Sequence, residues 1–81
     1  MDTVKEQIIN IIAKYFEINH TLINENSELD HDIGCDSLDI VELTMEIEEN
    51  LGIEINDEHM TELKTVGDLI RVAEKLKEGK L

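Results

Sequence analysis

The sequence predicts an all-α fold, a small four-helix bundle of three main helices plus a short third helix, with a long loop between helices 1 and 2. Three segments place apolar residues at helical spacing, each begins at a capping signal, and no segment alternates convincingly enough to be a strand. Residues 1–81 are expected to form a single domain, because a chain of this length is near the lower limit for folding around one core.

The first helix is predicted from about Asp2 to Phe16. Thr3-Val4-Lys5-Glu6 has the pattern of a capping box, in which the threonine oxygen accepts from the third helical N–H and the glutamate reaches back. Apolar residues then follow at helical spacing, namely Val4, Ile8, Ile11, Ile12 and Tyr15.

The segment from Glu17 to Asp36 loses this periodicity and is rich in polar residues. A loop of about twenty residues is long for a compact domain, which indicates a function or a hidden turn of helix. The stretch Ser27-Glu28-Leu29-Asp30 is the candidate for that turn. The expected anchors of the loop in the core are Leu22, Ile23, Leu29 and Ile33.

The second helix is predicted from Ser37 to about Asn50. Asp36 suits the N-cap because its side chain accepts a backbone N–H, and Asp39 sits where the helix dipole favours an anion. Gly52 is predicted to close the helix in a left-handed conformation.

After this glycine the chain predicts an extended link, a short helix and a last main helix. The short helix spans Glu58 to Glu62 and is capped by Asn56 and Asp57. The last helix opens at a second capping-box pattern, Thr65-Val66-Gly67-Asp68. Its apolar side consists of Val66, Leu69, Ile70, Ala73 and Leu76, and the lysines near its C-terminal end are Lys75, Lys77 and Lys80.

The second helix is apolar on two opposite sides. At about 100° per residue, one side takes four bulky residues and is assigned to the bundle core. The opposite side forms an apolar strip, which either packs beneath the long loop or is an exposed docking face for a basic partner. The core side is Ile40, Leu43, Ile47 and Leu51; the apolar strip is Leu38, Val41 and Met45; and the acids beside it are Asp39, Glu42, Glu46 and Glu49.

The net charge of −13 excludes some partners and favours others. Such a charge repels nucleic acid phosphates and anionic membrane surfaces, and it steers the protein toward basic partners. From Thr21 to Leu63 there are fourteen Asp or Glu and no Lys or Arg, so the middle of the chain is the anionic surface.

Cysteine use and hydropathy indicate a soluble cytoplasmic protein. Cys35 is the only cysteine, so that no intramolecular disulfide can form and a reducing compartment fits. No apolar run approaches transmembrane length, and residues 1–20 lack the features of a secretory signal. The chain is expected to be a monomer without membrane insertion.

Ser37 is a candidate for modification rather than for catalysis. A serine at a helix start is common for structural reasons alone. As a nucleophile it lacks the Gly-x-Ser-x-Gly elbow, and the nearest histidine, His31, has no evident orienting geometry. The chain is therefore not expected to be an enzyme, and a serine modified by another enzyme fits the pattern better.

No dedicated metal site is expected. The pattern Asp30-x-Asp32-x-Gly34 resembles the start of an EF-hand, but Cys35 then occupies the glycine position and Val41 the position of the bidentate glutamate. His20, His31 and His59 have no ligand-like spacing and are expected on the surface. The acids are expected to bind Mg²⁺ or Ca²⁺ loosely.

Cys35 is expected to be a packing residue with a raised thiol pKa.

The segment Asp36-Ser37-Leu38-Asp39, after Gly34 and before Val41-Glu42-Leu43, resembles the attachment motif of acyl carrier proteins. The resemblance extends over nearly the whole chain, through its size, its acidity and the long first loop. It includes Asp32-Ile33-Gly34, Gly52-Ile53-Glu54-Ile55 and Thr65-Val66-Gly67-Asp68. Two positions depart from the family pattern, since Asn56 stands where proline is frequent and Cys35 where alanine is usual.

This resemblance implies a carrier in which Ser37 receives 4′-phosphopantetheine from coenzyme A through a Mg²⁺-dependent phosphopantetheinyl transferase. The thiol of that arm, and not Cys35, would carry acyl groups as thioesters, most often in fatty acid biosynthesis. The alternatives are a specialised carrier for a polyketide, aminoacyl or D-alanyl pathway, or an unmodified acidic interaction module. Family behaviour also implies contacts with the basic docking patches of fatty acid synthesis enzymes through Asp36, Leu38, Asp39, Val41, Glu42, Met45 and Glu49.

Overall fold

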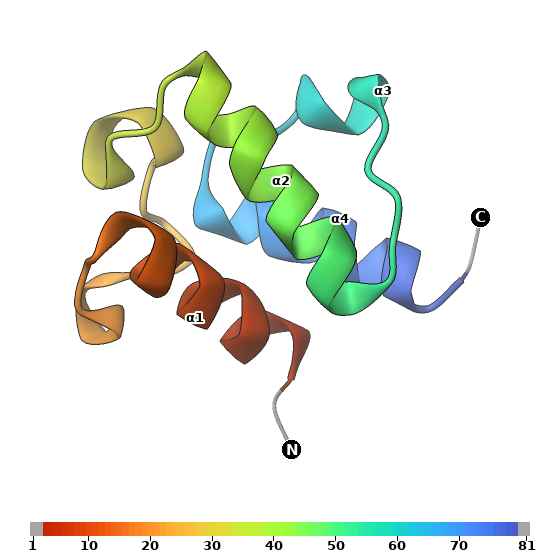
Figure 1. Ribbon diagram of the computed structural model, residues 1–81, viewed down its shortest axis with the longest axis horizontal. Coiled ribbons are helices and arrows are strands. Elements are labelled where there is room, and N and C mark those ends of the chain that lie inside the picture. Colours follow the sequence, from red (N-terminus) through yellow and green to blue (C-terminus); the bar gives the residue numbers. More distant parts are fainter. Residues whose placement is uncertain (1–2, 80–81) are drawn as a thin grey trace.

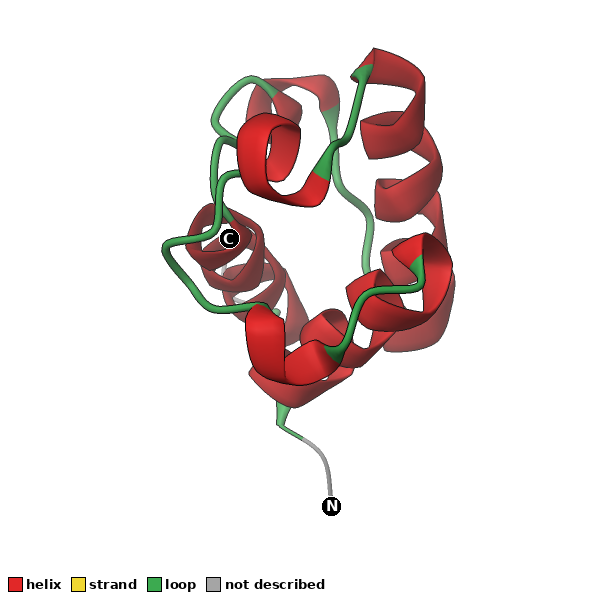
Figure 2. Cartoon of the chain, turned by 90° about the vertical axis from the view of Figure 1, so that its left-hand side faces the viewer, coloured by secondary structure: helices red, strands yellow, loops and turns green. Residues whose placement is uncertain are grey.

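The computed structural model describes residues 3–79, and within them it contains helices and connecting segments without a strand (Figures 1 and 2). The predicted all-α fold is therefore confirmed. The expected helix start at Asp2 and the lysine at position 80 lie outside the described residues. The elements are α1 (Val4–Phe16), η1 (His20–Leu22), η2 (Leu29–Ile33), α2 (Ser37–Leu51), α3 (Asp57–Met60) and α4 (Val66–Lys77).

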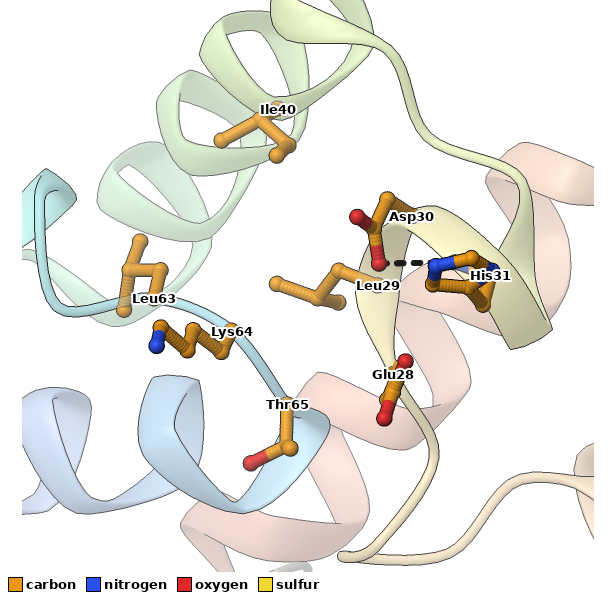
Figure 3. A pocket seen from close by; sticks show the side chains of 8 residues that line it. All are labelled: Glu28, Leu29, Asp30, His31, Ile40, Leu63, Lys64 and Thr65. Carbon is orange, nitrogen blue, oxygen red and sulfur yellow. Dashed lines mark hydrogen bonds between the residues drawn. The ribbon is translucent and has the colours of Figure 1, made fainter.

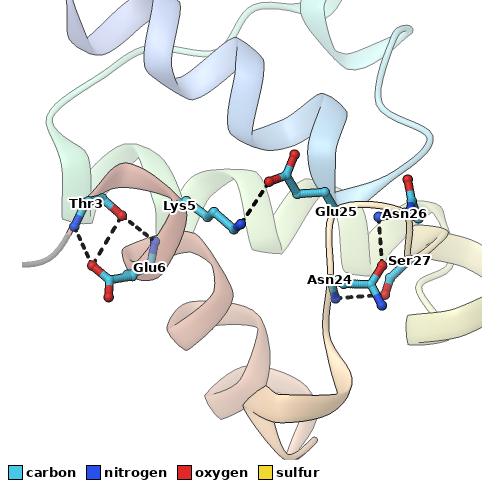
Figure 4. Close-up of polar contacts among 7 residues, drawn as sticks. All are labelled: Thr3, Lys5, Glu6, Asn24, Glu25, Asn26 and Ser27. Atoms are coloured by element: carbon cyan, nitrogen blue, oxygen red, sulfur yellow. Dashed lines mark hydrogen bonds and ion pairs between the residues drawn. The ribbon is translucent and has the colours of Figure 1, made fainter.

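Each of the four α-helices begins at a capping box, because its N-cap side chain and the side chain three residues later exchange hydrogen bonds with the backbone. At α1 the Thr3 hydroxyl accepts from the Glu6 N–H at 3.1 Å, and the Glu6 carboxylate accepts from the Thr3 N–H at 2.9 Å (Figure 4). The predicted box at Thr65 is confirmed in the same way. The predicted left-handed end of α2 is also confirmed, with a φ of 68° at Gly52.

The short third helix begins one residue earlier and ends two residues earlier than predicted. It begins at Asp57 and ends at Met60, because the Asn56 side chain accepts from the N–H of His59 at 3.0 Å and so caps the helix one residue earlier than expected. Asn56, one of the two departures from the pattern of the family that the sequence resembles, thus supplies a cap.

Hydrogen bonds between residues far apart in sequence hold the loop between α1 and α2 against the start of α4. Three backbone hydrogen bonds of 2.9 Å join Leu29, Ser27 and Glu25 to Lys64, Val66 and Gly67 in turn. An ion pair of 2.9 Å between Lys5 and Glu25 adds a tie to α1 (Figure 4). A chain segment of this length is therefore ordered by backbone pairing rather than by its own helices.

Two expectations for this loop need correction. The hidden turn is η2, which spans Leu29–Ile33, so it starts two residues later than predicted and overlaps the predicted stretch at Leu29 and Asp30. Leu22 was expected to be an anchor and is instead 71% exposed. Because η1 ends there and Ile23 enters extended backbone, the two neighbours point in different directions and Ile23 alone is buried.

The hydrophobic core lies between α1, α2 and α4, which surround it as three main helices (Figure 1). Its members come from all three helices and from the two connecting segments, so that one contiguous core serves the described residues. Fully buried large side chains are Ile8, Ile12, Leu29, Leu43, Ile47, Leu69 and Val66.

Candidate functional site

Ser37 is the first residue of α2 and is exposed to solvent. Its position is fixed from the preceding residues, since the side chain of Cys35 is buried in the core and the backbone N–H of Cys35 donates to the Leu29 carbonyl at 2.8 Å. Within residues 3–79 the Ser37 hydroxyl has no hydrogen-bond partner. The serine is therefore presented to solvent without a base to activate it.

The N-terminus of α2 is closed by the predicted cap. The Asp36 carboxylate accepts from the Asp39 N–H at 2.8 Å, and the Asp39 carboxylate accepts from the Asp36 N–H at 3.2 Å. These two acids thus fix the start of the helix on which Ser37 stands. They also place two negative charges beside the serine.

The two apolar sides of α2 differ sharply in exposure. Leu43, Ile47 and Leu51 are at most 2% exposed, and Ile40 packs at the edge of the core. The apolar strip does not pack beneath the loop: its residues are exposed by 65% at Leu38, 41% at Val41 and 56% at Met45. Three large apolar side chains in a row on one helix form a patch that water does not favour.

The acids around this strip have different surroundings. Glu42 and Glu49 are exposed, whereas Asp39 and Glu46 are half-buried on the flank toward α1. The hydroxyl of Tyr15, from the last turn of α1, donates a hydrogen bond to the Glu42 carboxylate. On the opposite flank, the Glu48 carboxylate accepts from the Ile55 N–H at 2.7 Å and so fixes the segment after α2.

Tyr15 is a residue whose place sequence reasoning did not find. Its helical spacing puts it in line with the apolar residues of α1, but its side chain is 39% exposed and reaches α2. The sequence signal was weak, because the partner, Glu42, is 27 residues away. A tyrosine at the edge of an apolar face, opposite an acid-rich helix, is the pattern that would have indicated it.

Cys35 is a packing residue, as predicted. Burial raises the pKa of the Cys35 thiol to about 11, with smaller contributions from the negative charges of Asp39, Asp36 and Asp30. The thiol is 5% exposed and is protonated at neutral pH. It is thus unsuited to serve as the acyl-carrying thiol.

A pocket of about 410 Å³ lies beside the start of α2, between η2 and the segment that precedes α4 (Figure 3). Its apolar wall is formed by Leu29, Ile40 and Leu63, one side chain from each of three segments. Its rim is polar and includes Asp30 and Lys64. Ile40 lies three residues after Ser37 on the same helix, so the pocket is adjacent to the helical turn that bears the serine.

Among the described residues, one cluster of acids and histidines could offer three ligand atoms to a metal ion. It consists of Glu28, Asp30 and His31. All three side chains are exposed, and the Asp30 carboxylate accepts from the His31 N–H at 2.8 Å. His20 is exposed as expected. His59 departs from the expectation of a surface histidine, since it is half-buried and takes part in the cap of α3.

Comparison with known proteins decides the family. A family model described as a phosphopantetheine attachment site matches residues 6–73. An acyl carrier protein from Wolinella succinogenes is 40% identical over 73 residues, which cover 90% of this chain and 91% of that protein. The chain belongs to the acyl carrier protein family.

A solved structure gives the same result for the fold of this acyl carrier protein. The acyl carrier protein from Enterococcus faecalis superposes with a TM-score of 0.76 at 26% identity, over 90% of this chain and 92% of that one. As a family member the chain is a carrier and not an enzyme, and its cofactor is covalently attached 4′-phosphopantetheine. Across residues 3–79, none of the helices has the length and apolarity needed to span a membrane.

Proposed function

We propose that Ser37 is the residue to which 4′-phosphopantetheine is attached, and that the arm's thiol carries acyl intermediates as thioesters in fatty acid biosynthesis. The observation that supports this most strongly is the exposed Ser37 hydroxyl on the first turn of α2, directly beside an exposed apolar strip. The other serine, Ser27, is 7% exposed, and its hydroxyl accepts from the Asn24 N–H at 3.1 Å (Figure 4). Ser37 is thus the more accessible of the two serines.

The residues around Ser37 fit a reaction performed by a second enzyme. In the attachment the serine oxygen attacks the phosphorus that bears the pantetheine in coenzyme A. A phosphodiester to the serine forms, the pyrophosphate P–O bond breaks, and adenosine 3′,5′-bisphosphate leaves. This chain supplies the hydroxyl and holds it at a capped helix start, whereas a phosphopantetheinyl transferase supplies Mg²⁺ and accepts the proton. The chain needs no base of its own, in agreement with a hydroxyl that no side chain of residues 3–79 contacts by hydrogen bond.

The docking face of this carrier consists of the apolar strip and its neighbouring acids. Exposed apolar side chains at the centre and carboxylates at the rim suit transient contact with a basic patch, because charge speeds encounter and apolar contact gives short-range affinity. We assign contacts with the transferase and with fatty acid synthesis enzymes to these residues. They are Asp36, Leu38, Asp39, Val41, Glu42, Met45 and Glu49.

The pocket beside Ile40 is the proposed shelter for the acyl chain. Its apolar wall reaches the core through Leu29 and Leu63, which are 1% and 8% exposed. A core built almost without aromatic residues is compatible with the small rearrangements that a longer acyl chain requires.

We further propose that the carrier acts in the cytoplasm as a monomer with one domain over residues 1–81.

The attachment is tested by weighing the protein after incubation with coenzyme A, Mg²⁺ and a broad-specificity phosphopantetheinyl transferase. We expect a mass gain of one phosphopantetheine for the wild type and none for Ser37→Ala. No gain in the wild type, or an equal gain in the variant, would refute the proposal and favour an unmodified acidic interaction module.

The cargo needs a separate assay. Loading of the modified protein by an acyl-transferring enzyme of fatty acid synthesis is the expected result. Loading only by an adenylating enzyme that activates an amino acid would instead assign the chain to an aminoacyl or D-alanyl pathway. Loading only with the building blocks of a polyketide would assign it to that pathway.

A further inference from the structure

We infer that Tyr15 is a positioning residue of the docking face, because its hydroxyl holds the Glu42 carboxylate in place for a cationic side chain of a partner enzyme. The inference rests on the proposed carrier function and extends the docking face from α2 onto α1. The partner chemistry that fits is a lysine ammonium or an arginine guanidinium.

The geometry joins two helices across a long sequence distance. Tyr15 lies in the last turn of α1, and its ring packs against that of Phe16 with centroids 4.9 Å apart and planes tilted by 60°. Phe16 is half-buried and packs against the core. Phe16 therefore holds the tyrosine ring in place. The tyrosine hydroxyl reaches the Glu42 carboxylate, 27 residues further along the chain.

The charges around the hydroxyl keep it a donor. The hydrogen bond to Glu42 raises the pKa of Tyr15 to about 12, and burial and the carboxylates of Glu42, Asp39 and Glu46 act in the same direction. The side chain is thus neutral and protonated at neutral pH. It uses part of the hydrogen-bonding capacity of the Glu42 carboxylate and leaves its negative charge in place. A lysine at the same position would neutralise that charge.

One oxygen of Glu42 accepts from Tyr15, and the carboxylate has a second oxygen for a partner. An exposed glutamate that is not held samples many rotamers, and a partner must restrict them when it docks. A carboxylate that is already fixed avoids much of this loss of conformational entropy. The hydrogen bond should therefore strengthen docking even though Tyr15 adds no charge.

A groove lies beside Tyr15, between α1 and α2. It has a volume of about 330 Å³ and is lined by residues of α1 and α2 that include Lys14, Tyr15 and Glu46. Met45 of the apolar strip is the neighbour of Glu46 in sequence and is exposed. The hydrogen bond from Tyr15 to Glu42 thus joins the edge of α1 to the docking face.

The hydrogen bond between Tyr15 and Glu42 could also have the opposite effect and weaken docking. If Tyr15 merely occupied Glu42, a partner would have to displace it, and removal of the hydroxyl would strengthen docking. The two accounts predict opposite signs for Tyr15→Phe, which deletes the hydroxyl and keeps the ring on Phe16.

The experiment measures kcat and KM of a phosphopantetheinyl transferase with coenzyme A and Mg²⁺, with this carrier as the varied substrate. For Tyr15→Phe we expect KM to rise about two- to tenfold with kcat nearly unchanged, and melting to stay close to wild type. In a Glu42→Gln background the same substitution should have little further effect. Glu74→Gln on α4, which removes one exposed acid away from α2, is the control for net charge.

The outcomes separate this inference from the proposed function. A wild type that is not modified at all would refute the carrier proposal. A wild type that is modified, with an unchanged or lower KM for Tyr15→Phe, would overturn the positioning inference alone. So would an equal effect of Tyr15→Phe with and without Glu42→Gln.

A spectroscopic titration tests the contact itself without a partner enzyme. Tyr15 is the only tyrosine, and there is no tryptophan, so the ultraviolet absorbance of the chain reports its ionisation directly. Glu42→Gln should lower the pKa of Tyr15 from about 12 toward its ordinary value of about 10. An unchanged titration would show that the hydroxyl is not on Glu42 and would overturn the inference.

Discussion

Cys35 and Ser37 stand two residues apart and have opposite surroundings. The thiol is buried at 5% exposure, and the hydroxyl is exposed at the start of α2. The same short segment thus anchors the chain in the core and presents the proposed attachment residue.

The raised pKa of Cys35 leads to a prediction on reactivity. With its pKa at about 11, the thiol holds at neutral pH about a hundredfold less thiolate than an ordinary cysteine. An alkylating reagent should therefore modify Cys35 at least about tenfold more slowly in the folded protein than in denaturant. Equal rates in the two states, measured by mass, would contradict the buried position.

Cys35 and Tyr15 together predict how stability depends on alkaline pH. Both pKa values are raised in the folded state, to about 11 and about 12, so the folded protein favours the protonated forms. This contribution to stability is complete below the ordinary pKa values of about 9 and about 10, and is lost as pH rises through the folded values. Urea unfolding midpoints should fall between about pH 8 and about pH 11. A midpoint that rises over this range would contradict the sign of both shifts.

At the scale of single residues, chemistry close in sequence was predictable and contacts across the fold were not. Acids beside Cys35 predicted the direction of its pKa, although the largest cause is burial. The exposure of Leu22 and the hydroxyl of Tyr15 depend on how η1 and α2 lie in space. Neither placement has a local signature.

At the scale of elements, the periodicity of α2 predicted both of its sides. Apolar residues at helical spacing on opposite faces assigned Ile40, Leu43, Ile47 and Leu51 to the bundle core, and their burial confirms this assignment. What periodicity left open was whether the strip lies under the loop. The answer depends on the loop's pairing with α4, which no local pattern indicates.

The cap of α2 gives a prediction that separates fold from docking. Asp36→Ala removes the acceptor for the Asp39 N–H and should lower the free energy of unfolding by about 0.5–2 kcal/mol in urea titration. Asp36→Asn keeps an acceptor, so its free energy of unfolding should fall by only a small part of this amount. Docking of the Asp36→Asn variant to a basic partner should still weaken, because one negative charge is gone. Equal stability of the two variants would contradict the role of the cap.

The contact between the loop and α4 predicts an unusual sign for a helical glycine. A Cβ on Gly67 would lie 3.0 Å from the Glu25 carbonyl oxygen, which itself accepts from the Gly67 N–H. Gly67→Ala should therefore destabilise the protein by about 1 kcal/mol or more, although alanine is ordinarily the better helix former by about that amount. A rise in the urea midpoint would show that the loop does not press against α4.

At the scale of the whole molecule, the net charge of −13 opposes the compact state. The described residues contain two salt bridges, Lys5–Glu25 and Arg71–Asp68, so that most acids have no basic partner at close range. The sequence predicted this imbalance, since the fourteen acids between Thr21 and Leu63 have no basic residue among them. The same charge that costs stability attracts basic partners.

Cations should accordingly stabilise the fold. Millimolar Mg²⁺ should raise the melting temperature, because it screens and binds the central acids. Sodium chloride at matched ionic strength is the control, and a smaller rise with it would indicate binding beyond general screening. Melting that is insensitive to both salts would contradict the view that the acids repel one another.

The central claim is that Ser37 receives the phosphopantetheine arm, and the chain contains its own control, since Ser27 is buried and Ser37 is exposed. The most direct measurement is fragmentation mass spectrometry of the protein after transfer from coenzyme A. The account predicts one phosphopantetheine per chain, located on Ser37, with Ser27 unmodified. An arm on Ser27, or no arm under conditions that modify another acyl carrier protein completely, would contradict it.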